Sequence, residues 1–496
     1  LRMTTQSPLT LYKLSKQSLL KSETTASSAL HDLPTLIFHE IFIEAFMREH
    51  NEVLKVMVQA WPFPCLPLRS LMDLREPRTP YTPLGKVALQ QRNLQTLQAL
   101  LDGLDMQLSQ KVHHSRWRLQ MLDWRDVHRD FWTVGPRAMR AAHSEDASNK
   151  ETGKPGLRKK KPTLTILMHL CFEAWSKSCV TRDELQLCLL NWARKRKASV
   201  HLCCEKVMIN SKAVFTILKL LRAVQLDSIQ ELDVFSDWGR ESMKAFVPLL
   251  KKMMNLRTFH FSSLSPEVYT SAQKNKRDSR FYAFHLGQMQ SLRELHIDDV
   301  FFLEGTLHKI LRSQTPLEVL SLSSSPLKES DLKHLAHCAS TSQLKSLSLR
   351  KFSMKSFNPE TLQALLDKLA CTLETLVLEH CDITDAQFLA ILPALSRCSQ
   401  LKTFSCYGNP ISLGILQVLL RLCAGLSQLT KGLYPAPLES YESKIPAKFV
   451  DPEKFPQVCA KLEQVLKDIR PSLSIRICTY SCDWCMICQL YRLEPN

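Results

Sequence analysis

The sequence Leu-Lys-Ser-Leu-Ser-Leu at residues 344–349 decides the fold, because near copies of it recur along the chain. Each copy has an apolar residue, two variable residues, Leu or Phe, one variable residue and a further apolar residue. Seven copies start 25 to 36 residues apart, at Ile229, Leu256, Leu292, Leu317, Leu344, Leu373 and Leu401. Weaker copies start at Leu119 and Leu429. One copy would be weak support, whereas seven at near-regular spacing indicate a repeat array.

The pattern is the leucine-rich repeat signature, in which a short strand alternates buried and exposed positions. Between strands the apolar spacing becomes helical, as in Leu362, Leu365 and Leu369 after the helix start at Pro359. Repeats of 27 to 29 residues leave room for an outer α-helix. The predicted fold class is therefore α/β: a leucine-rich repeat solenoid, or horseshoe, with an inner parallel β-sheet, outer α-helices and a helical N-terminal cap.

The chain divides into five predicted regions. They are a helical N-terminal region (1–105), a first irregular repeat (106–136), a basic polar linker (137–162), the repeat array (163–435), and a C-terminal cap with a Cys-rich tail (436–496). We expect residues 163–191 to be helical. Residues 265–280 are polar and are expected to form the loop behind the 36-residue spacing that precedes Leu292.

No motif points to catalysis or to a cofactor. The chain lacks a P-loop, G-x-G-x-x-G, G-x-S-x-G and H-E-x-x-H, and its 12 Gly among 496 residues are few for folds built on phosphate-cradling turns. The 16 His are scattered. No stretch of 18 or more uncharged apolar residues predicts a membrane span. We therefore expect a non-catalytic protein without a cofactor and without a membrane contact.

The charge is strongly basic. Lys and Arg number 65 against 48 Asp and Glu, so the formal net charge is +17. Arg158, Lys159, Lys160 and Lys161 form a basic run in a polar stretch, which is typical of a nuclear import signal, although a solvated surface run is the plainer alternative. Because no motif interleaves aromatic and basic residues, we do not expect direct nucleic-acid binding.

The C-terminal tail holds a dense cysteine cluster at Cys478, Cys482, Cys485 and Cys488. Four thiolates can hold Zn²⁺ or an iron–sulfur cluster. Structural zinc sites usually separate two Cys pairs by a longer loop, however, and four ligands so close together would be cramped. We therefore expect a Cys-rich tail without a metal, and zinc is the alternative.

Two N-terminal patterns are typical of helices that dock on a partner. Over residues 10–19, Leu11, Leu14, Ser15 and Leu19 share one helical face, and the small central residue permits close approach. Over residues 33–41, Pro34 starts a helix whose Ile37 and Ile41 share a face. The alternative is that both helices only cap the repeat array.

The chain resembles the PRAME family of leucine-rich repeat proteins over nearly its whole length. The resemblance is carried by residues 33–34, 54–68 (LKVMVQAWPFPCLPL), 101–105 (LDGLD), 130–134 (DFWTV), 224–229 (VQLDSI) and 433–441 (LYPAPLESY). It implies a substrate receptor of a cullin-2 ubiquitin ligase that contacts elongins B and C. It also implies roles in negative regulation of transcription, differentiation and apoptosis, in the cytoplasm and the nucleus.

The resemblance places the expected contacts. Residues 10–19 are similar to the elongin-C-binding box, with Thr10, Leu11, Leu14, Ser15 and Leu19 as its residues, and residues 33–41 are similar to a cullin-2 box with Leu33, Pro34, Ile37 and Ile41. Ser15 departs from the Cys of the box pattern, or the Ala frequent in the family. Because burying an unpaired hydroxyl costs about 1–3 kcal/mol, we expect weaker elongin binding.

The repeat array would hold a protein substrate that the sequence does not identify. The second residue of each copy is expected to face that partner from the concave sheet: Arg257, Arg293, Glu318, Lys345, Glu374 and Lys402. The alternative function is a nuclear protein-interaction module that represses transcription without ligase activity, which the basic run favours.

Overall fold

The computed structural model describes residues 10–30, 32–76, 83–110, 114–140, 164–173, 183–264, 272–313, 315–443, 449–469, 475–479 and 489–493. The chain divides into two compact units. The first comprises residues 1–207 and 215–229, and the second comprises residues 208–214 and 230–496. Within the described residues, no helix is both long and apolar enough to cross a membrane.

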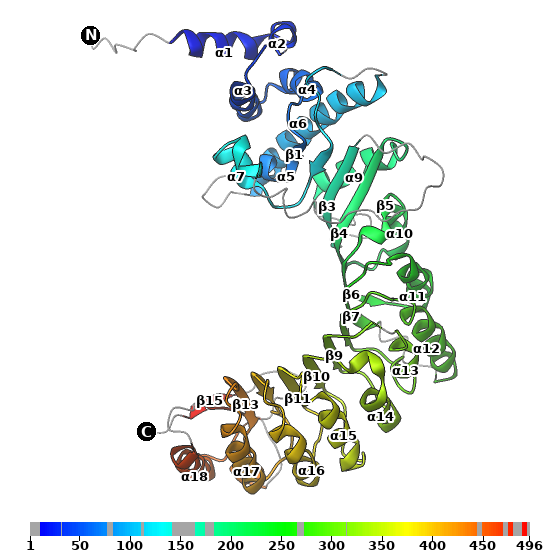
Figure 1. Cartoon of the computed structure of the whole chain (residues 1–496), viewed down its shortest axis with the longest axis vertical. Coiled ribbons are helices and arrows are strands. Elements are labelled where there is room, and N and C mark those ends of the chain that lie inside the picture. The colour runs from blue at the N-terminus through cyan, green and yellow to red at the C-terminus, as the bar shows by residue number, and fades with distance from the viewer. Residues whose placement is uncertain are drawn as a thin grey trace, which may run out of the picture. The chain divides into compact units, whose positions relative to one another are not determined.

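The first unit is helical at its start and ends in parallel strands (Figure 1). Its helices are α1 (Leu11–Lys21), α2 (Glu23–Ala29), α3 (Thr35–Met47), α4 (Asn51–Gln59), α5 (Leu68–Met72), α6 (Pro83–Ser109), α7 (Arg129–Thr133), α9 (Glu184–Arg194) and α10 (Val214–Leu221), with 3-10 turns η1 (Asp73–Arg75), η2 (Pro136–Arg140) and η3 (Leu226–Ser228). Its strands are β1 (Cys65–Pro67), β2 (Met121–Asp123), β3 (Leu164–Glu173), β4 (Val200–Asn210) and β5 (Val224–Gln225), in the order β1-β2-β3-β4 with β5 beside β4.

An aromatic cluster forms the core under α3. Phe42 lies 4.8 Å from Trp61 and Phe131 lies 4.7 Å from Trp132, measured between ring centroids. All four side chains are at most 4% exposed. Helices α4 and α6 pack so closely that a Cβ on Gly103 would lie 2.3 Å from the Lys55 carbonyl oxygen, so this position requires glycine. The expected boundary at residue 105 falls inside α6.

The helix predicted over residues 163–191 is wrong in its first half. Residues 164–173 form β3, whose side chains alternate between buried and partly exposed, and Ile166 pairs with Leu122 of β2. The helical part starts only at Glu184 in α9. A run of Leu, Ile, Met and Phe does not by itself distinguish a buried strand from a helix, and here pairing with β2 decides for the strand.

The second unit is the repeat array. Its strands are β6 (Glu231–Trp238), β7 (Thr258–Leu264), β8 (Glu294–Asp298), β9 (Val319–Ser323), β10 (Ser346–Arg350), β11 (Thr375–Glu379), β12 (Thr403–Ser405), β13 (Lys431–Pro435), β14 (Ile475–Cys478) and β15 (Leu490–Leu493). They pair in sequence order, parallel from β6 to β14, and β15 is antiparallel to β14. The second apolar residues of all seven copies pair in one register row, from Leu232 through Leu347 to Phe404, which confirms the repeat prediction.

Among the described residues, helices cover one face of this sheet and none covers the other, which we call the open face (Figure 1). They are α11 (Arg240–Phe246), α12 (Ala272–Leu286), α13 (Leu307–Ile310), α14 (Glu329–His337), α15 (Pro359–Leu369), α16 (Asp385–Ser396), α17 (Leu413–Ala424) and α18 (Lys454–Ile469), with 3-10 turns η4 (Val247–Lys252), η6 (Ala339–Thr341) and η7 (Leu438–Ser440). The α/β leucine-rich repeat class is thus confirmed. The loop predicted over residues 265–280 is wrong for its described part, because residues 272–286 form α12.

Several strands end in a residue with left-handed backbone. Asp299, Ser324, Lys351 and His380 follow β8, β9, β10 and β11 with φ of about 50°. Their amides donate to the next strand's end, as Ser324 does to the Arg350 carbonyl at 3.0 Å. These hydrogen bonds continue the ladder around the corner of the repeat, which offsets the strain of positive φ in residues other than glycine.

Candidate protein-interaction surfaces

Helix α1 presents an apolar surface to solvent. Thr10 caps the helix, because its Oγ1 accepts from the Lys13 amide at 3.3 Å. Leu11 is 80% exposed and Leu14 is 48% exposed. The Ser15 hydroxyl donates to the Leu11 carbonyl oxygen of its own helix at 2.8 Å. Of the predicted box residues, four are therefore accessible and Leu19 is half-buried, and the polar group of Ser15 already has a partner.

Polar bridges tie α1 to α3. The Tyr12 hydroxyl donates to Glu40 Oε2 at 2.5 Å, and this hydrogen bond raises the pKa of Tyr12 to about 12. The Lys16 ammonium lies 2.6 Å from a Glu44 carboxylate oxygen. The two helices that carry the predicted boxes are therefore held against each other.

Helix α3 offers only part of the predicted cullin-2 box. Pro34 is its exposed N-cap residue, and Leu33 and Ile37 are half-buried. Ile41 is 2% exposed, so it belongs to the core and cannot contact a partner directly. Leu36, which the sequence prediction omitted, is 48% exposed. Phe38 and Phe42 are buried on the opposite face of α3, and this burial shows that Leu36 faces outward.

The open face of the repeat sheet is lined by the third, fifth and seventh residues of each copy. The fifth residues form one row across six strand pairings: Asp233, His260, His296, Ser321, Ser348, Val377 and Ser405. The fourth and sixth residues of each copy, which flank the fifth, are buried in the core. The face is therefore mostly polar, with charged side chains on β6 to β8 and an ion pair between Arg350 and Glu379 at 3.0 Å on β10 and β11.

The six charged residues predicted to face the partner lie where the strands begin. Each precedes the first residue of its strand, at the N-terminal end of that strand. The alternation of side chains within the strand therefore does not determine its orientation. The six pair largely with one another: Arg293 with Glu318 at 2.9 Å, Glu318 with Lys345 at 2.8 Å, and Glu374 with Lys402 at 2.6 Å. Hydrogen bonds from Lys345 and Arg293 hold the pKa of Glu318 below its ordinary value. We call this row, Arg257 to Lys402, the charge ladder.

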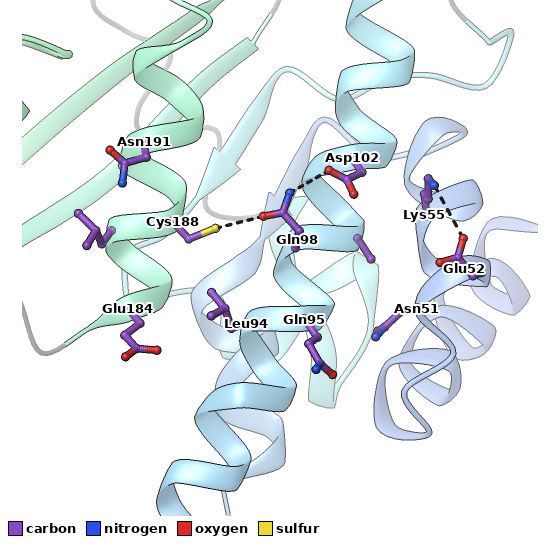
Figure 2. Close-up of a pocket in the computed structure, with 12 residues that line it drawn as sticks. Asn51, Glu52, Lys55, Leu94, Gln95, Gln98, Asp102, Glu184, Cys188 and Asn191 are labelled. Atoms are coloured by element: carbon purple, nitrogen blue, oxygen red, sulfur yellow. Dashed lines mark hydrogen bonds and ion pairs between the residues drawn. The ribbon is translucent and has the colours of Figure 1, made fainter.

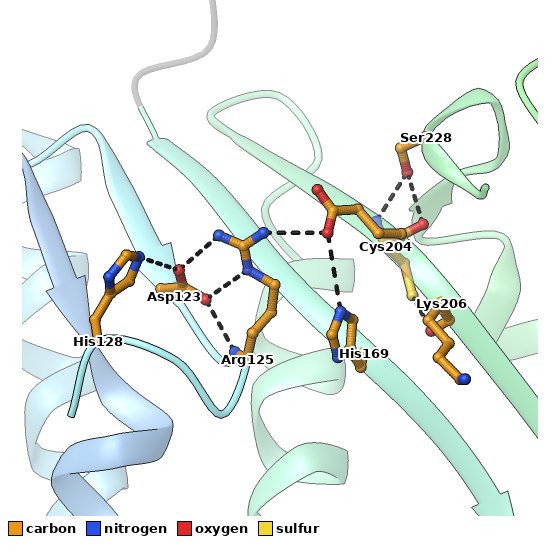
Figure 3. A network of polar contacts seen from close by, with 8 residues as sticks. Asp123, Arg125, His128, His169, Cys204, Lys206 and Ser228 are labelled. Carbon is orange, nitrogen blue, oxygen red and sulfur yellow. Dashed lines mark hydrogen bonds and ion pairs between the residues drawn. The ribbon is translucent and has the colours of Figure 1, made fainter. Parts of the chain in front are cut away.

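A polar network crosses the strands of the first unit (Figure 3). The fully buried Asp123 accepts from the Arg125 guanidinium at 2.9 Å and 3.0 Å, and Arg125 also donates to Glu205 at 3.1 Å. His169 Nε2 lies 3.9 Å from Glu205. Hydrogen bonding to Asp123 raises the pKa of Arg125. A buried carboxylate needs such a partner, so the network holds the end of β2 against β4.

A pocket of about 790 Å³ lies between α4, α6 and α9 (Figure 2). Its amide and acidic side chains partly pair with one another, since Gln98 donates to Asp102 at 2.9 Å. Cys188 donates to the Gln98 side-chain oxygen at 3.7 Å, and burial raises the pKa of its thiol. A protonated thiol in this setting is a poor nucleophile.

Two predicted sites fall partly or wholly outside the described residues. The basic run from Arg158 to Lys161 lies outside them, as do Cys482, Cys485 and Cys488. Cys478 is buried in β14. Within the part of the chain that the structure describes, no group of three or more His, Cys, Asp or Glu side chains could hold a metal.

The chain matches two family descriptions along most of its length. The PRAME N-terminal domain matches residues 8–79 and 77–132, and the PRAME C-terminal domain matches residues 164–496. It is 39% identical to human PRAME family member 12 over 100% of this chain and 97% of that protein, and 38% identical to human PRAME family member 8 over 100% and 99%.

Among solved structures, a yeast complex of Rad7 and Elc1 contains a chain that is 17% identical to this one. The match has a TM-score of 0.33 and covers 49% of this chain and 62% of that chain. A likeness this small supports no inference about partners. The sequence relatives and the two domain matches decide the family: the chain belongs to the PRAME family.

Proposed function

We propose that this protein is a non-catalytic substrate receptor of a ubiquitin ligase, built on cullin-2 with elongins B and C, in cytoplasm and nucleus. The exposed apolar surface of α1 carries the proposal. Leu11 and Leu14 leave large apolar areas in water on a helix that the chain holds in place through α3. Exposed apolar area of this kind is stabilised when a partner's groove covers it.

Elongin C is the proposed occupant of this surface, because the spacing of Thr10, Leu11, Ser15 and Leu19 matches the elongin-binding box. Ser15 is compatible with that role. Its hydroxyl keeps the hydrogen bond to Leu11 inside the helix, so burial against a partner leaves no unpaired donor. The expectation of weaker binding therefore loses its main physical ground.

The proposed contact with cullin-2 uses the accessible start of α3. Leu33, Pro34 and Leu36 lie there, adjacent along the chain. Ile41 is instead buried and helps to orient that surface, while Ile37 is half-buried, as Leu33 is, and belongs to the proposed contact. The open face of the repeat sheet is the proposed site for the protein to be ubiquitinated, because its polar strand positions are uncovered by helices.

A pull-down tests the proposal. Full-length protein should recover elongin B, elongin C and cullin-2 from a mixture of the purified proteins, and Leu11→Ala should recover at least tenfold less. The matched control is Leu389→Ala, which removes a 51%-exposed leucine from α16. Equal recovery by the Leu11→Ala protein and the wild type would refute the contact.

The alternative function is a nuclear protein-interaction module that represses transcription without any ligase. The basic run from Arg158 to Lys161 favours it. Deletion of these four residues should abolish nuclear entry if the run is an import signal. A protein that still represses a reporter gene with Leu11→Ala in place would favour this function over the ligase.

A further inference from the structure

A small hollow on the open face lies over β6 to β9. It has a volume of about 230 Å³ and is lined by Phe235, His260, Phe261, Ser262, His296, Ile297, Asp298, Ser321 and Ser323. Binding pockets for whole small molecules usually measure about 300–1,000 Å³. The volume of this hollow therefore suits one inserted side chain better than a cofactor.

A carboxylate oxygen in this hollow lacks a partner. Asp298 Oδ1 is buried and forms no hydrogen bond with any described residue, while Oδ2 has only the Ser262 hydroxyl at 3.5 Å. Asp298 is half-buried and lines the hollow, so its under-bonded carboxylate would be stabilised by a donor that enters there. Charge-assisted donors, above all guanidinium, form the strongest such hydrogen bonds.

The walls of the hollow favour a flat cation. The Phe235 ring is 43% exposed and lies 6.4 Å from the His260 ring, whose centroid is 4.0 Å from that of His296. His260 Nδ1 lies 2.5 Å from Asp233 Oδ1. Burial lowers the pKa of His296 to about 4, so this ring is neutral near pH 7. Aromatic faces attract cations, and arginine also stacks flat on them.

The local charge is opposite to that of the chain. Among the described residues, the lining holds a carboxylate and no Lys or Arg, and Glu294 stands beside it with an oxygen 4.0 Å from His296 Nε2. On a protein of net charge +17, this hollow is an acidic spot within a basic field. It therefore selects for a cation locally, while the remainder of the surface repels strongly basic partners.

We propose that the hollow between Phe235, His296 and Asp298 is the anchor point for one arginine side chain of the protein bound on the open face. The guanidinium donates to Asp298 and lies against Phe235 and the imidazole pair. The inference rests on the proposed use of the open face for partner binding, and it does not depend on elongin or cullin-2.

Selection from a displayed library of random twelve-residue peptides on the full-length protein provides the test. The recovered peptides should be enriched in arginine. The best peptide should bind at least tenfold more weakly, by fluorescence anisotropy, when its arginine is replaced by the neutral isostere citrulline. Asp298→Asn protein should lose as much affinity for the arginine peptide and little for the citrulline peptide.

Controls separate the site from folding and from the ligase. Asp367→Asn removes a carboxylate from helix α15, on the covered side of the sheet, and should leave peptide binding unchanged. Leu11→Ala protein should select the same peptides, so failure of the ligase proposal would leave this result standing. The inference is overturned if the selection is empty or without cationic enrichment. It is also overturned if the citrulline peptide binds as tightly as the arginine peptide. This comparison uses only wild-type protein, so a misfolded variant cannot affect it.

Discussion

Ser15 shows how one hydrogen bond changes the meaning of a substitution. Judged from the sequence, a hydroxyl at the centre of a docking surface should weaken binding. In the structure the hydroxyl donates to the Leu11 carbonyl oxygen, which is a common arrangement for serine within a helix. Burial of the hydroxyl against a partner therefore costs little free energy, because the hydroxyl keeps this hydrogen bond within the helix.

Ser15→Ala should accordingly change the affinity for elongin C by less than about 1 kcal/mol, because it removes a satisfied hydroxyl and not an unpaired one. Isothermal titration calorimetry with elongin B and C measures this. Ser15→Arg is the companion variant and should abolish binding by steric exclusion. A tenfold gain for Ser15→Ala would show that hydroxyl burial does limit binding.

His296 should make stability depend on pH. Burial and the neighbouring His260 lower its pKa to about 4 in the folded chain, against about 6.5 when unfolded, while Asp233 acts in the opposite direction. The unfolded state therefore binds more protons between these values. Protonation of His296 in the unfolded state therefore lowers the free energy of unfolding as pH falls from 6.5 toward 4, by at most about 1.4 kcal/mol per pH unit. Above pH 6.5 this loss is absent.

Denaturant unfolding of wild type and His296→Gln at several pH values isolates this contribution. The difference in unfolding free energy between the two proteins should change across pH 6.5 to 4 and should be constant from pH 7 to 8. Because other half-buried histidines also titrate, the difference and not the wild-type curve is the measurement. A difference that does not vary with pH would contradict the assignment.

Among the elements, strands were easier to predict than the residues at their ends. Leucine spacing alone locates β6 to β12, because buried positions repeat with period two and each copy is preceded by a helix. The same spacing cannot reveal that each strand begins only at the third residue of its copy. For that reason the sequence predicts Arg257 and the other charge-ladder residues within the strands, although each precedes its strand by one residue.

Other elements were missed because their cause is tertiary. Residues 164–173 form a strand because they pair with β2. Helix α12 forms in a polar stretch of the kind that predicts a loop. The orientation of α3, which buries Ile41, follows from the aromatic core beneath it. The hollow on the open face is lined by residues of four strands, β6 to β9. These residues are far apart in the sequence, and the register of strand pairing brings them together.

Packing of α6 on α4 should make Gly103 sensitive to substitution. A Cβ there would meet the Lys55 carbonyl oxygen at 2.3 Å and Val58 Cγ1 at 2.5 Å, so the helices must separate. Gly103→Ala should destabilise the protein by about 1–3 kcal/mol despite alanine's higher helix propensity. Gly414→Ala in α17 is the control, since the nearest atom there is Ser412 Oγ at 3.9 Å. Thermal unfolding should show a loss for the first variant and none for the second.

At the scale of the molecule, the repeat array depends on its ends. Helix α18 buries Phe455, Val458, Leu462, Val465 and Leu466 at the C-terminal side of the array. Each repeat contacts mainly its neighbours, so stability is close to a sum of local terms, and an uncovered end opens first.

Leu462→Ala should therefore cost about 2–5 kcal/mol locally and loosen the array from that end. Hydrogen exchange followed by mass spectrometry should accelerate in β13 and α17 and fall back to wild-type rates toward β6. Uniform acceleration along the second unit would mean that the array opens as one cooperative block instead.

Part of the charge ladder depends on the number of repeats between its members. Its members alternate in sign along Glu318, Lys345, Glu374 and Lys402, each beside the next repeat's member. Excision of the single repeat that carries Glu374 would set Lys345 beside Lys402, whereas excision of two consecutive repeats would keep opposite charges adjacent. Like charges side by side repel. From Arg293 to Lys402, removal of two consecutive repeats thus keeps opposite charges adjacent, whereas removal of one does not; the rule does not extend to Arg257, which already lies beside Arg293.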